Sequence, residues 1–205
     1  MSRRDRRRST RRGRGSKRPA RVRQVQTKRL LVSTSIAAAV FMAAALWLPL
    51  FAFDRTAVLD GQFWRLVTCH LTHLDPQHAL VNAVGCGLVV TILRDSMSWK
   101  AITACVVILA STVSLASVLL WVRIDFAGFS GVLYGLATMA AFALRKRSPW
   151  LAGLIAVVLV AGIIAGIAGY SRPWTADVAL HTHVVGIAVG AWLGNWIRRN
   201  PSRSR

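Results

Sequence analysis

The sequence predicts an all-α protein that crosses a membrane several times, and three observations support this fold class. Apolar residues make up 54% of the 205 residues, and the mean hydropathy of +0.46 is too high for an ordinary soluble domain. Of the 27 Lys and Arg residues, 14 lie in the first 29 positions, so the charges are segregated from the apolar blocks. All seven acidic residues are Asp, and none lies inside an apolar block.

The lack of carboxylates in the apolar blocks excludes two classes of membrane protein. Proton-coupled transporters and aspartyl intramembrane proteases both need carboxylates at membrane depth. The three cysteines, Cys69, Cys86 and Cys105, are too few and too scattered for a disulfide framework. We therefore expect neither redox chemistry nor a cofactor or bound metal.

A basic arm, residues 1–29, precedes the membrane domain. It cannot bury apolar area, so we expect it to be disordered and cytoplasmic. Two roles remain open: binding anionic lipid headgroups, at about 1 kcal/mol per basic residue near the surface, or fixing the orientation alone. Nucleic-acid binding is not expected, because no interleaved aromatic residues or accompanying fold support it. Residues 30–197 form the membrane domain, and 198–205 form a short basic cytoplasmic tail.

Six apolar blocks follow one another, from Leu30 to Phe53 and then over 77–93, 101–122, 129–144, 150–169 and 178–197. Backbone polar groups in lipid must be satisfied within the segment, so these blocks should be helices. A spanning helix needs about 20 residues, a length that the second and fourth blocks do not reach. The first block is too long for a signal-peptide core, so we expect an uncleaved first span.

The basic residues in the connections predict the orientation. If the arm is cytoplasmic, the connections on its side carry most of the remaining Lys and Arg residues, as the positive-inside rule requires. The sequence thus predicts a six-helix bundle with both termini in the cytoplasm. It would be a multi-pass protein of the cell membrane with a large extracytoplasmic loop over residues 54–76.

Polar side chains at membrane depth occur on three of the predicted helices: His78 and Asn82 on the second, Ser130 on the fourth and His183 on the sixth. Such groups are costly in lipid and usually functional. Asp75-Pro76 is typical of an N-cap followed by a first-turn proline, so the second helix should begin there, and His78 and Asn82 share a face of its first two turns. His183 lies about 8 Å below the start of its helix, and the short fourth helix recesses Ser130 by about 6 Å. We expect all four at one level on the extracytoplasmic side.

Glycines at four-residue spacing mark two of these helices, Gly131 and Gly135 on the fourth and Gly186, Gly190 and Gly194 on the sixth. Such ridges allow helix backbones to approach closely in lipid. The fourth and sixth helices are therefore expected to be neighbours, which would bring the serine toward the histidine.

Together these residues resemble the rhomboid intramembrane proteases over residues 61–195. The matching motifs, in chain order, are Trp64-Arg65, His78-Ala-Leu-Val-Asn82, Gly128-Phe129-Ser130-Gly131 with Tyr134 one turn later, and His183-Val-Val-Gly186-Ile-Ala-Val-Gly190. Each motif is common alone, but all of them in this order are specific. The stretch from Trp64 to His78 is also similar to the rhombosortase branch, which processes glycine-rich C-terminal anchors.

The resemblance implies a serine protease in which Ser130 is the nucleophile and His183 the base, without an acidic partner. It also implies that Tyr134 packs under the imidazole and that His78 and Asn82 help form the oxyanion hole. The implied supporting residues are Gly128, Gly131, Gly186, Gly190, Trp64 and Arg65. The substrates would be single-span membrane proteins, cut near their extracytoplasmic end in a helix-breaking segment of small residues.

Two other functions remain open. The first is a catalytically silent, rhomboid-like adaptor, although the intact pair of Ser130 and His183 argues against it. The second is a metal-handling protein that uses the five histidines, His70, His73, His78, His181 and His183, although no carboxylate or thiolate partner lies at depth.

Two structural expectations accompany these alternatives. His181 and His183 are two residues apart and cannot both face the core of one helix, so we expect His181 at the rim. The serines of the third helix, Ser111, Ser114 and Ser117, are expected to pack or to bond their own backbone.

Overall fold

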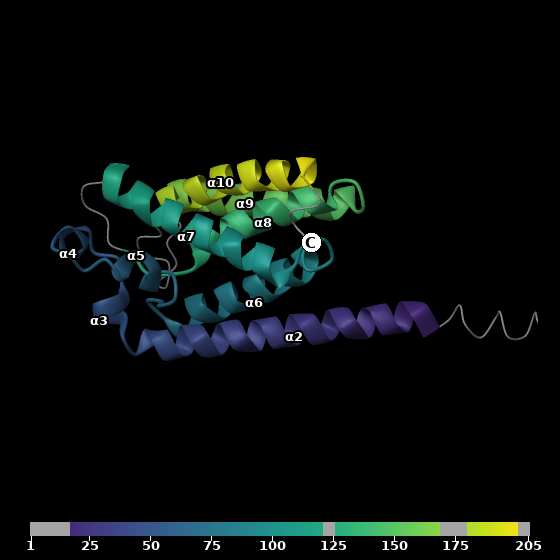
Figure 1. Cartoon of the computed structure of the whole chain (residues 1–205), viewed down its shortest axis with the longest axis horizontal. Helices are drawn as coiled ribbons and strands as arrows, with labels where there is room; N and C mark the ends of the chain where they lie inside the picture. The colour runs from purple at the N-terminus through teal and green to yellow at the C-terminus, as the bar shows by residue number, and fades with distance from the viewer. Residues whose placement is uncertain (1–16, 121–125, 169–179, 201–205) are drawn as a thin grey trace, which may run out of the picture.

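The computed structural model describes residues 17–120, 126–168 and 180–200, with side chains from residue 22 onward. Across these ranges the chain is almost wholly helical and forms no strand beyond one isolated bridge between Phe53 and Phe126. An α-helix satisfies its own backbone polar groups, which apolar surroundings demand. The predicted all-α class is confirmed. Helices carry the labels of Figure 1.

Six long helices correspond to the six apolar blocks: α2 (Lys17–Ala45), α6 (Pro76–Leu93), α7 (Trp99–Leu120), α8 (Ser130–Leu144), α9 (Pro149–Ile167) and α10 (Leu180–Arg199). Within the described ranges, four of them are long and apolar enough to cross a membrane: α2 from Val22 onward, α6, α7 and α9. Helix α8 has only 15 residues, and polar residues such as His181, His183 and Asn195 lower the mean hydropathy of α10.

The first helix begins earlier than the sequence analysis expected. Helix α2 starts at Lys17, so residues 17–29 are helical where disorder was expected. Arg, Lys, Gln and Ala are good helix formers, and extending an existing helix is easier than starting a new one. The described part of the basic arm is thus a continuation of the first apolar helix. Residues 1–16 of the arm and 201–205 of the tail lie outside the described residues.

The same helix also ends earlier than expected, at Ala45 rather than at Phe53. Pro49 has no amide hydrogen and clashes with the preceding turn of a helix, so a continuous helix through it is unfavourable. A turn at residues 46–47 leads instead into the short helix α3 (Leu48–Phe51). Two more short helices, α4 (Arg55–Leu59) and α5 (Arg65–Thr68), lie in the stretch predicted as a large loop.

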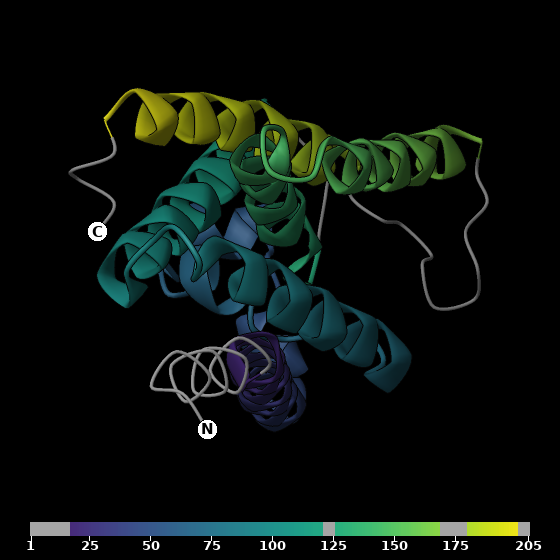
Figure 2. The ribbon, with the colours of Figure 1, turned by 90° about the vertical axis from the view of Figure 1, so that its right-hand side faces the viewer.

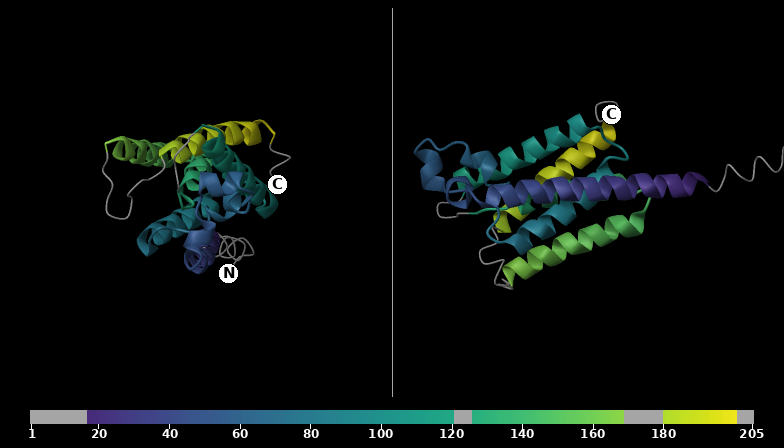
Figure 3. Two further views of the ribbon diagram at one scale, coloured as in Figure 1. Left: turned by 90° about the vertical axis from the view of Figure 1, so that its left-hand side faces the viewer. Right: turned by 90° about the horizontal axis from the view of Figure 1, so that it is seen from below.

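Helix α8 lies in the middle of the bundle. It packs most closely on α10 and also contacts α6, α7 and α9, while α2 packs along α6. Figure 1 shows α2 and α10 at opposite edges with α8 between them, and the end-on view in Figure 2 agrees. Eight of the 15 residues of α8 are buried, whereas Leu159 is the one buried residue of α9. Seen from below, α9 forms an outer edge of the bundle (Figure 3).

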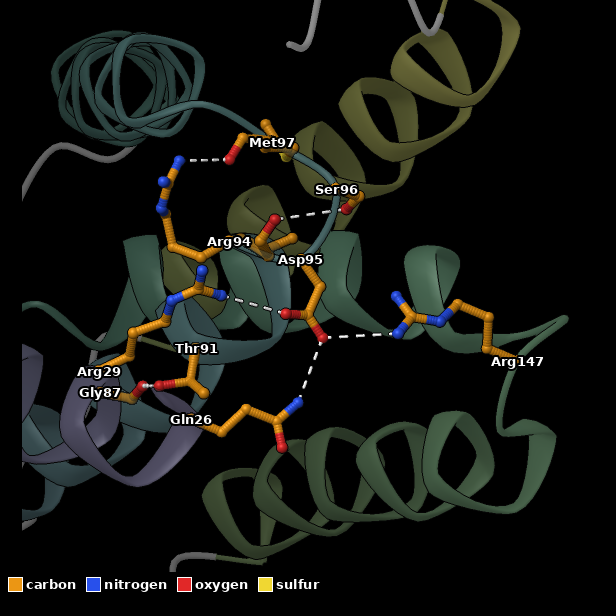
Figure 4. A network of polar contacts seen from close by, with 10 residues as sticks. Gln26, Arg29, Gly87, Thr91, Arg94, Asp95, Ser96, Met97 and Arg147 are labelled. Carbon is orange, nitrogen blue, oxygen red and sulfur yellow. Dashed lines mark hydrogen bonds and ion pairs between the residues drawn. The ribbon is translucent and has the colours of Figure 1, made fainter. Parts of the chain in front are cut away.

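One carboxylate joins three segments at the end of the bundle away from α3–α5. Asp95, in the turn after α6, accepts from Arg29 of α2 at 3.2 Å and from Arg147 of the α8–α9 turn at 3.5 Å. Gln26 donates to the same carboxylate at 3.5 Å (Figure 4). Exposed ion pairs contribute little individually, but this one carboxylate connects α2, the end of α6 and the α8–α9 turn.

The short helices hold the chain just before α8. Phe53 and Phe126 exchange backbone hydrogen bonds of 2.8 and 3.3 Å, and their rings stack at 4.7 Å. The amide of Gly128 donates to the Cys69 carbonyl at 2.8 Å. The first residue of α8 is therefore fixed by contacts on the chain immediately before it.

Candidate active site

Ser130 is the first residue of α8, and the turn before it requires a glycine. Gly128 has a φ of +144°, which L side chains rarely adopt. A Cβ at this position would lie 2.8 Å from Cε1 of His78. A glycine at position 128 therefore allows both the positive φ and the close approach of the His78 imidazole. The result is a half-buried hydroxyl at a helix N-terminus, where the first amides have no intrahelical acceptor.

His183 of α10 reaches this hydroxyl directly. Its Nε2 lies 2.9 Å from Oγ of Ser130, and the imidazole is 5% exposed. The contact depends on the glycine ridges, because a Cβ at Gly186 would overlap the carbonyl oxygen of Gly131. One turn further, a Cβ at Gly190 would overlap the carbonyl oxygen of Gly135. The two backbones touch at these positions, and this brings the serine and the histidine within hydrogen-bond distance.

Tyr134 fixes the plane of the His183 ring. The two rings are stacked at a centroid distance of 4.0 Å and an interplanar angle of 2°. Tyr134 lies four residues after Ser130 on the same helix, so one face of α8 presents both the hydroxyl and the supporting ring. This stacking limits rotation of the imidazole and keeps Nε2 directed at the hydroxyl.

Two other serines also lie 2.9 Å from a histidine, but their hydroxyls are engaged differently. Ser114 contacts Nε2 of His70 and donates to the Leu66 carbonyl at 2.6 Å. Ser117 contacts Nε2 of His181 and donates to the Val113 carbonyl at 2.8 Å. A hydroxyl has one proton, so these two serines are acceptors from their histidines. Among the described residues, Ser130 has His183 as its hydrogen-bond partner and is free to give it the proton.

The contacts of Ser117 with His181 correct one expectation. His181 was expected at the rim, yet its side chain is 8% exposed. Helix α10 contacts both α7 and α8 at this end: His181 meets Ser117 of α7, while His183 meets Ser130 of α8. The two-residue spacing does place them on different faces, but both faces are buried. Ser114 was also expected to pack or to bond its own helix backbone, but its hydroxyl donates to the Leu66 carbonyl of α5.

His78 and Asn82 lie beside the turn that precedes Ser130. The N-terminus of α6 is fixed by Asp75, whose side chain accepts from the His78 amide at 2.8 Å, as the Asp75-Pro76 sequence predicted. His78 packs against Gly128, and Asn82 is buried, with its Nδ2 2.9 Å from Nε2 of His73. Both residues therefore lie beside the turn before the serine, His78 directly at Gly128 and Asn82 through His73, which bonds the Phe129 amide.

The family model described as Rhomboid domain matches residues 60–200, well over half of the chain. The chain belongs to the rhomboid family. No curated protein matches the chain. The rhomboid family is generally one of intramembrane serine proteases, and the match together with the apolar helices identifies this protein as an integral membrane protein. Membership of the rhombosortase branch stays a prediction.

The Trp64-Arg65 pair of this rhomboid bonds the backbone around α3. The buried Arg65 guanidinium donates to the carbonyls of Ala52 at 2.7 Å and Pro49 at 3.0 Å, and Trp64 Nε1 donates to the Leu50 carbonyl at 3.1 Å. These bonds satisfy the carbonyls of Pro49, Leu50 and Ala52, which lie in or just after α3 and have no donor within that helix. The pair therefore fastens α3 to α5.

Sequence reasoning did not include His73 among the site residues, although the structure places it there. This imidazole lies in the loop before α6 and is 2% exposed. Burial, and to a smaller extent the charge of His78, lower the pKa of His73 to about 4, while the nearby Leu71 carbonyl and Asp75 carboxylate oppose this. Burial also lowers the pKa of His70 to about 4. Both rings are neutral near pH 7.

The histidines of this rhomboid do not gather as ligands of one metal. Within the described ranges, no three His, Cys or Asp side chains form a group that could hold a metal ion. The imidazoles have other partners instead: His70 bonds the Ala110 carbonyl, His73 bonds Asn82, and His183 bonds Ser130. These contacts favour roles in hydrogen bonding over metal ligation.

Proposed function

We propose that this rhomboid is a serine endopeptidase that cleaves single-span membrane proteins near the extracytoplasmic face. The observation that carries the proposal is the 2.9 Å contact between Nε2 of His183 and Oγ of Ser130, with Tyr134 stacked on the imidazole. A serine hydroxyl becomes nucleophilic when an adjacent base takes its proton. The free proton of Ser130 distinguishes it from Ser114 and Ser117, which donate to carbonyls.

The reaction would proceed in two steps. Oγ of Ser130 bonds to the scissile carbonyl carbon as its proton moves to Nε2 of His183, and the imidazolium then protonates the leaving amine as the C–N bond breaks. Water, deprotonated by the same imidazole, attacks the acyl-enzyme and releases the serine. The oxyanion of each tetrahedral intermediate would be stabilised by the amide at the start of α8, by the helix dipole and by donors from Asn82 and His78.

The proposed orientation follows from the positions of the serine and of the basic residues at opposite ends of the bundle. The serine lies where α8 begins, beside α3–α5, while the Arg-rich connections and the basic start of α2 lie at the other end (Figure 1). We propose that the chain crosses the membrane six times and that α8 and α10 are among the spans. Both termini would lie in the cytoplasm, and the membrane would be the plasma membrane. The basic residues of α2 would then meet anionic headgroups of the cytoplasmic leaflet.

Labelling with a fluorophosphonate probe tests the proposal. Full-length protein in detergent should be labelled, and Ser130→Ala and His183→Ala should each abolish labelling. Ser117→Ala is the matched control, because that serine also lies 2.9 Å from a histidine and should leave labelling intact. Folded wild-type protein that is not labelled would favour the silent adaptor, and labelling that persists in Ser130→Ala would remove Ser130 as the nucleophile.

A further inference from the structure

His73 contacts two parts of the candidate site but takes no part in the proposed reaction steps. Its Nε2 lies 2.9 Å from Nδ2 of Asn82 and accepts from the backbone amide of Phe129 at 3.3 Å. Phe129 directly precedes Ser130, and Asn82 comes from α6. One ring atom therefore joins a side chain expected in the oxyanion hole to the turn that carries the nucleophile.

We infer that His73 is a positioning residue that orients the Asn82 amide and the Phe129–Ser130 turn for catalysis. This inference rests on the proposed protease function. His73 would not touch the substrate, and it would act by holding donors in the direction that the oxyanion requires.

The hydrogen-bond pattern fixes the orientation of the Asn82 amide. Because Nε2 of His73 accepts from the Phe129 amide, the ring must carry its proton on Nδ1. The group of Asn82 that faces Nε2 must then be the NH2 group, since an amide oxygen would face another acceptor. An NH2 group has two hydrogens, so one bonds His73 and the second stays available for the oxyanion.

Packing holds the His73 ring in this position. Phe41 of α2 lies 4.4 Å away in a tilted arrangement, and His78 meets the ring edge-on at 5.0 Å. The ring is almost fully buried, so Nε2 has no water to replace either of its donors. A residue without an acceptor at this point would leave the buried Asn82 donor unpaired and free to turn away.

A pair of amide substitutions separates positioning from simple structural support. His73→Gln places a carbonyl oxygen at about the reach of Nε2, whereas His73→Asn carries the same group one methylene shorter. We expect the maximal rate of fluorophosphonate labelling to fall at least about tenfold in His73→Asn, because a misplaced oxyanion donor loses much of its effect. His73→Gln should restore most of that rate, and the probe concentration for half-maximal rate should not change in either variant.

Controls make each outcome decisive. Thr72→Val alters another buried polar side chain of the same loop, whose hydroxyl donates to the Ala44 carbonyl of α2, and should leave the labelling rate unchanged. If His73→Asn does not fold, combining His73→Ala with Asn82→Ala tests the same link: the double variant should lose less than the sum of the two single losses. A wild-type rate in folded His73→Asn, or additive losses in the double variant, would overturn the inference. Folded wild type that is not labelled would instead overturn the proposed function, and the inference with it.

Discussion

The hydroxyl of Tyr134 lies against Gly162 of α9, on the helix that forms the outer edge of the bundle. A Cβ built on Gly162 would overlap Oη of the tyrosine, whose ring stacks on His183. The edge helix is therefore in contact with the ring that supports the histidine, although α9 supplies no side chain to the dyad.

Gly162→Ala should lower the labelling rate by displacing either α9 or the Tyr134 ring. Tyr134→Phe removes the overlapping oxygen, so the double variant should recover much of the lost rate. Gly153→Ala, on the same helix with open space around it, is the control and should be neutral or stabilise by up to about 1 kcal/mol. A full rate in Gly162→Ala would show that α9 and the tyrosine are not in contact during catalysis.

Gly186→Leu should separate α8 from α10 and abolish labelling. Its Cβ alone would overlap the Gly131 carbonyl, and a backbone atom cannot move aside as a flexible side chain does. We expect destabilisation of about 3 kcal/mol or more, measured by thermal unfolding in detergent. Gly153→Leu, which meets open space, controls for the added apolar volume. Unchanged stability and labelling in Gly186→Leu would mean that the two helices are not closely packed.

Gly128→Ala should abolish labelling while Gly61→Ala does not. Both glycines have a positive φ, +144° and +98°, so each substitution strains the backbone by about 1–3 kcal/mol. Only at Gly128 would the new methyl group also press on His78, whereas Gly61 has nothing within 4 Å. Comparing the labelling rates at matched stability isolates the contribution of the turn. Equal rates in the two variants would exclude a special role for this turn.

The stability of the protein should fall as the pH falls from about 6.5 to about 4. Burial lowers the pKa of His70 and of His73 from the ordinary value of 6.5 to about 4. In that window the unfolded chain binds protons that the folded chain excludes, so stability is present above it and is lost on acidification. Thermal unfolding across the window measures the effect, and His70→Gln should flatten the dependence. A pH-independent unfolding temperature would contradict the buried, neutral state of both rings.

The helices were predictable because their apolar lengths and end residues are local signals. The Asp75-Pro76 start of α6 was predicted correctly, and each of the last five apolar blocks agrees with its helix to within about two residues over the described range. The contact of α8 with α10 was likewise predictable from glycines at four-residue spacing. Boundaries failed in the first helix, where helix propagation into the basic residues and the effect of Pro49 were underestimated.

The tertiary partners of the histidines could not be predicted from the sequence. A helix face is buried or exposed according to its neighbours, and no local pattern indicates that α10 is covered by α7 as well as α8. His181 was therefore misplaced at the rim. His73 was missed because its role depends on a backbone amide, that of Phe129, which is 56 residues away. The one local signal for His73 is Asn82, nine residues later, whose side chain bonds the His73 imidazole.

The shared carboxylate of Asp95 has a consequence for the order in which the chain is assembled. Arg29 precedes Asp95 and Arg147 follows it, so during synthesis the carboxylate meets its first guanidinium as soon as α6 and α2 have paired. The second guanidinium arrives only after α7 and α8 have been made. The first two long helices can therefore pair through Arg29 and Asp95 before α8 and α9 are in place, and the turn between α8 and α9 then adds Arg147 to a carboxylate that is already held.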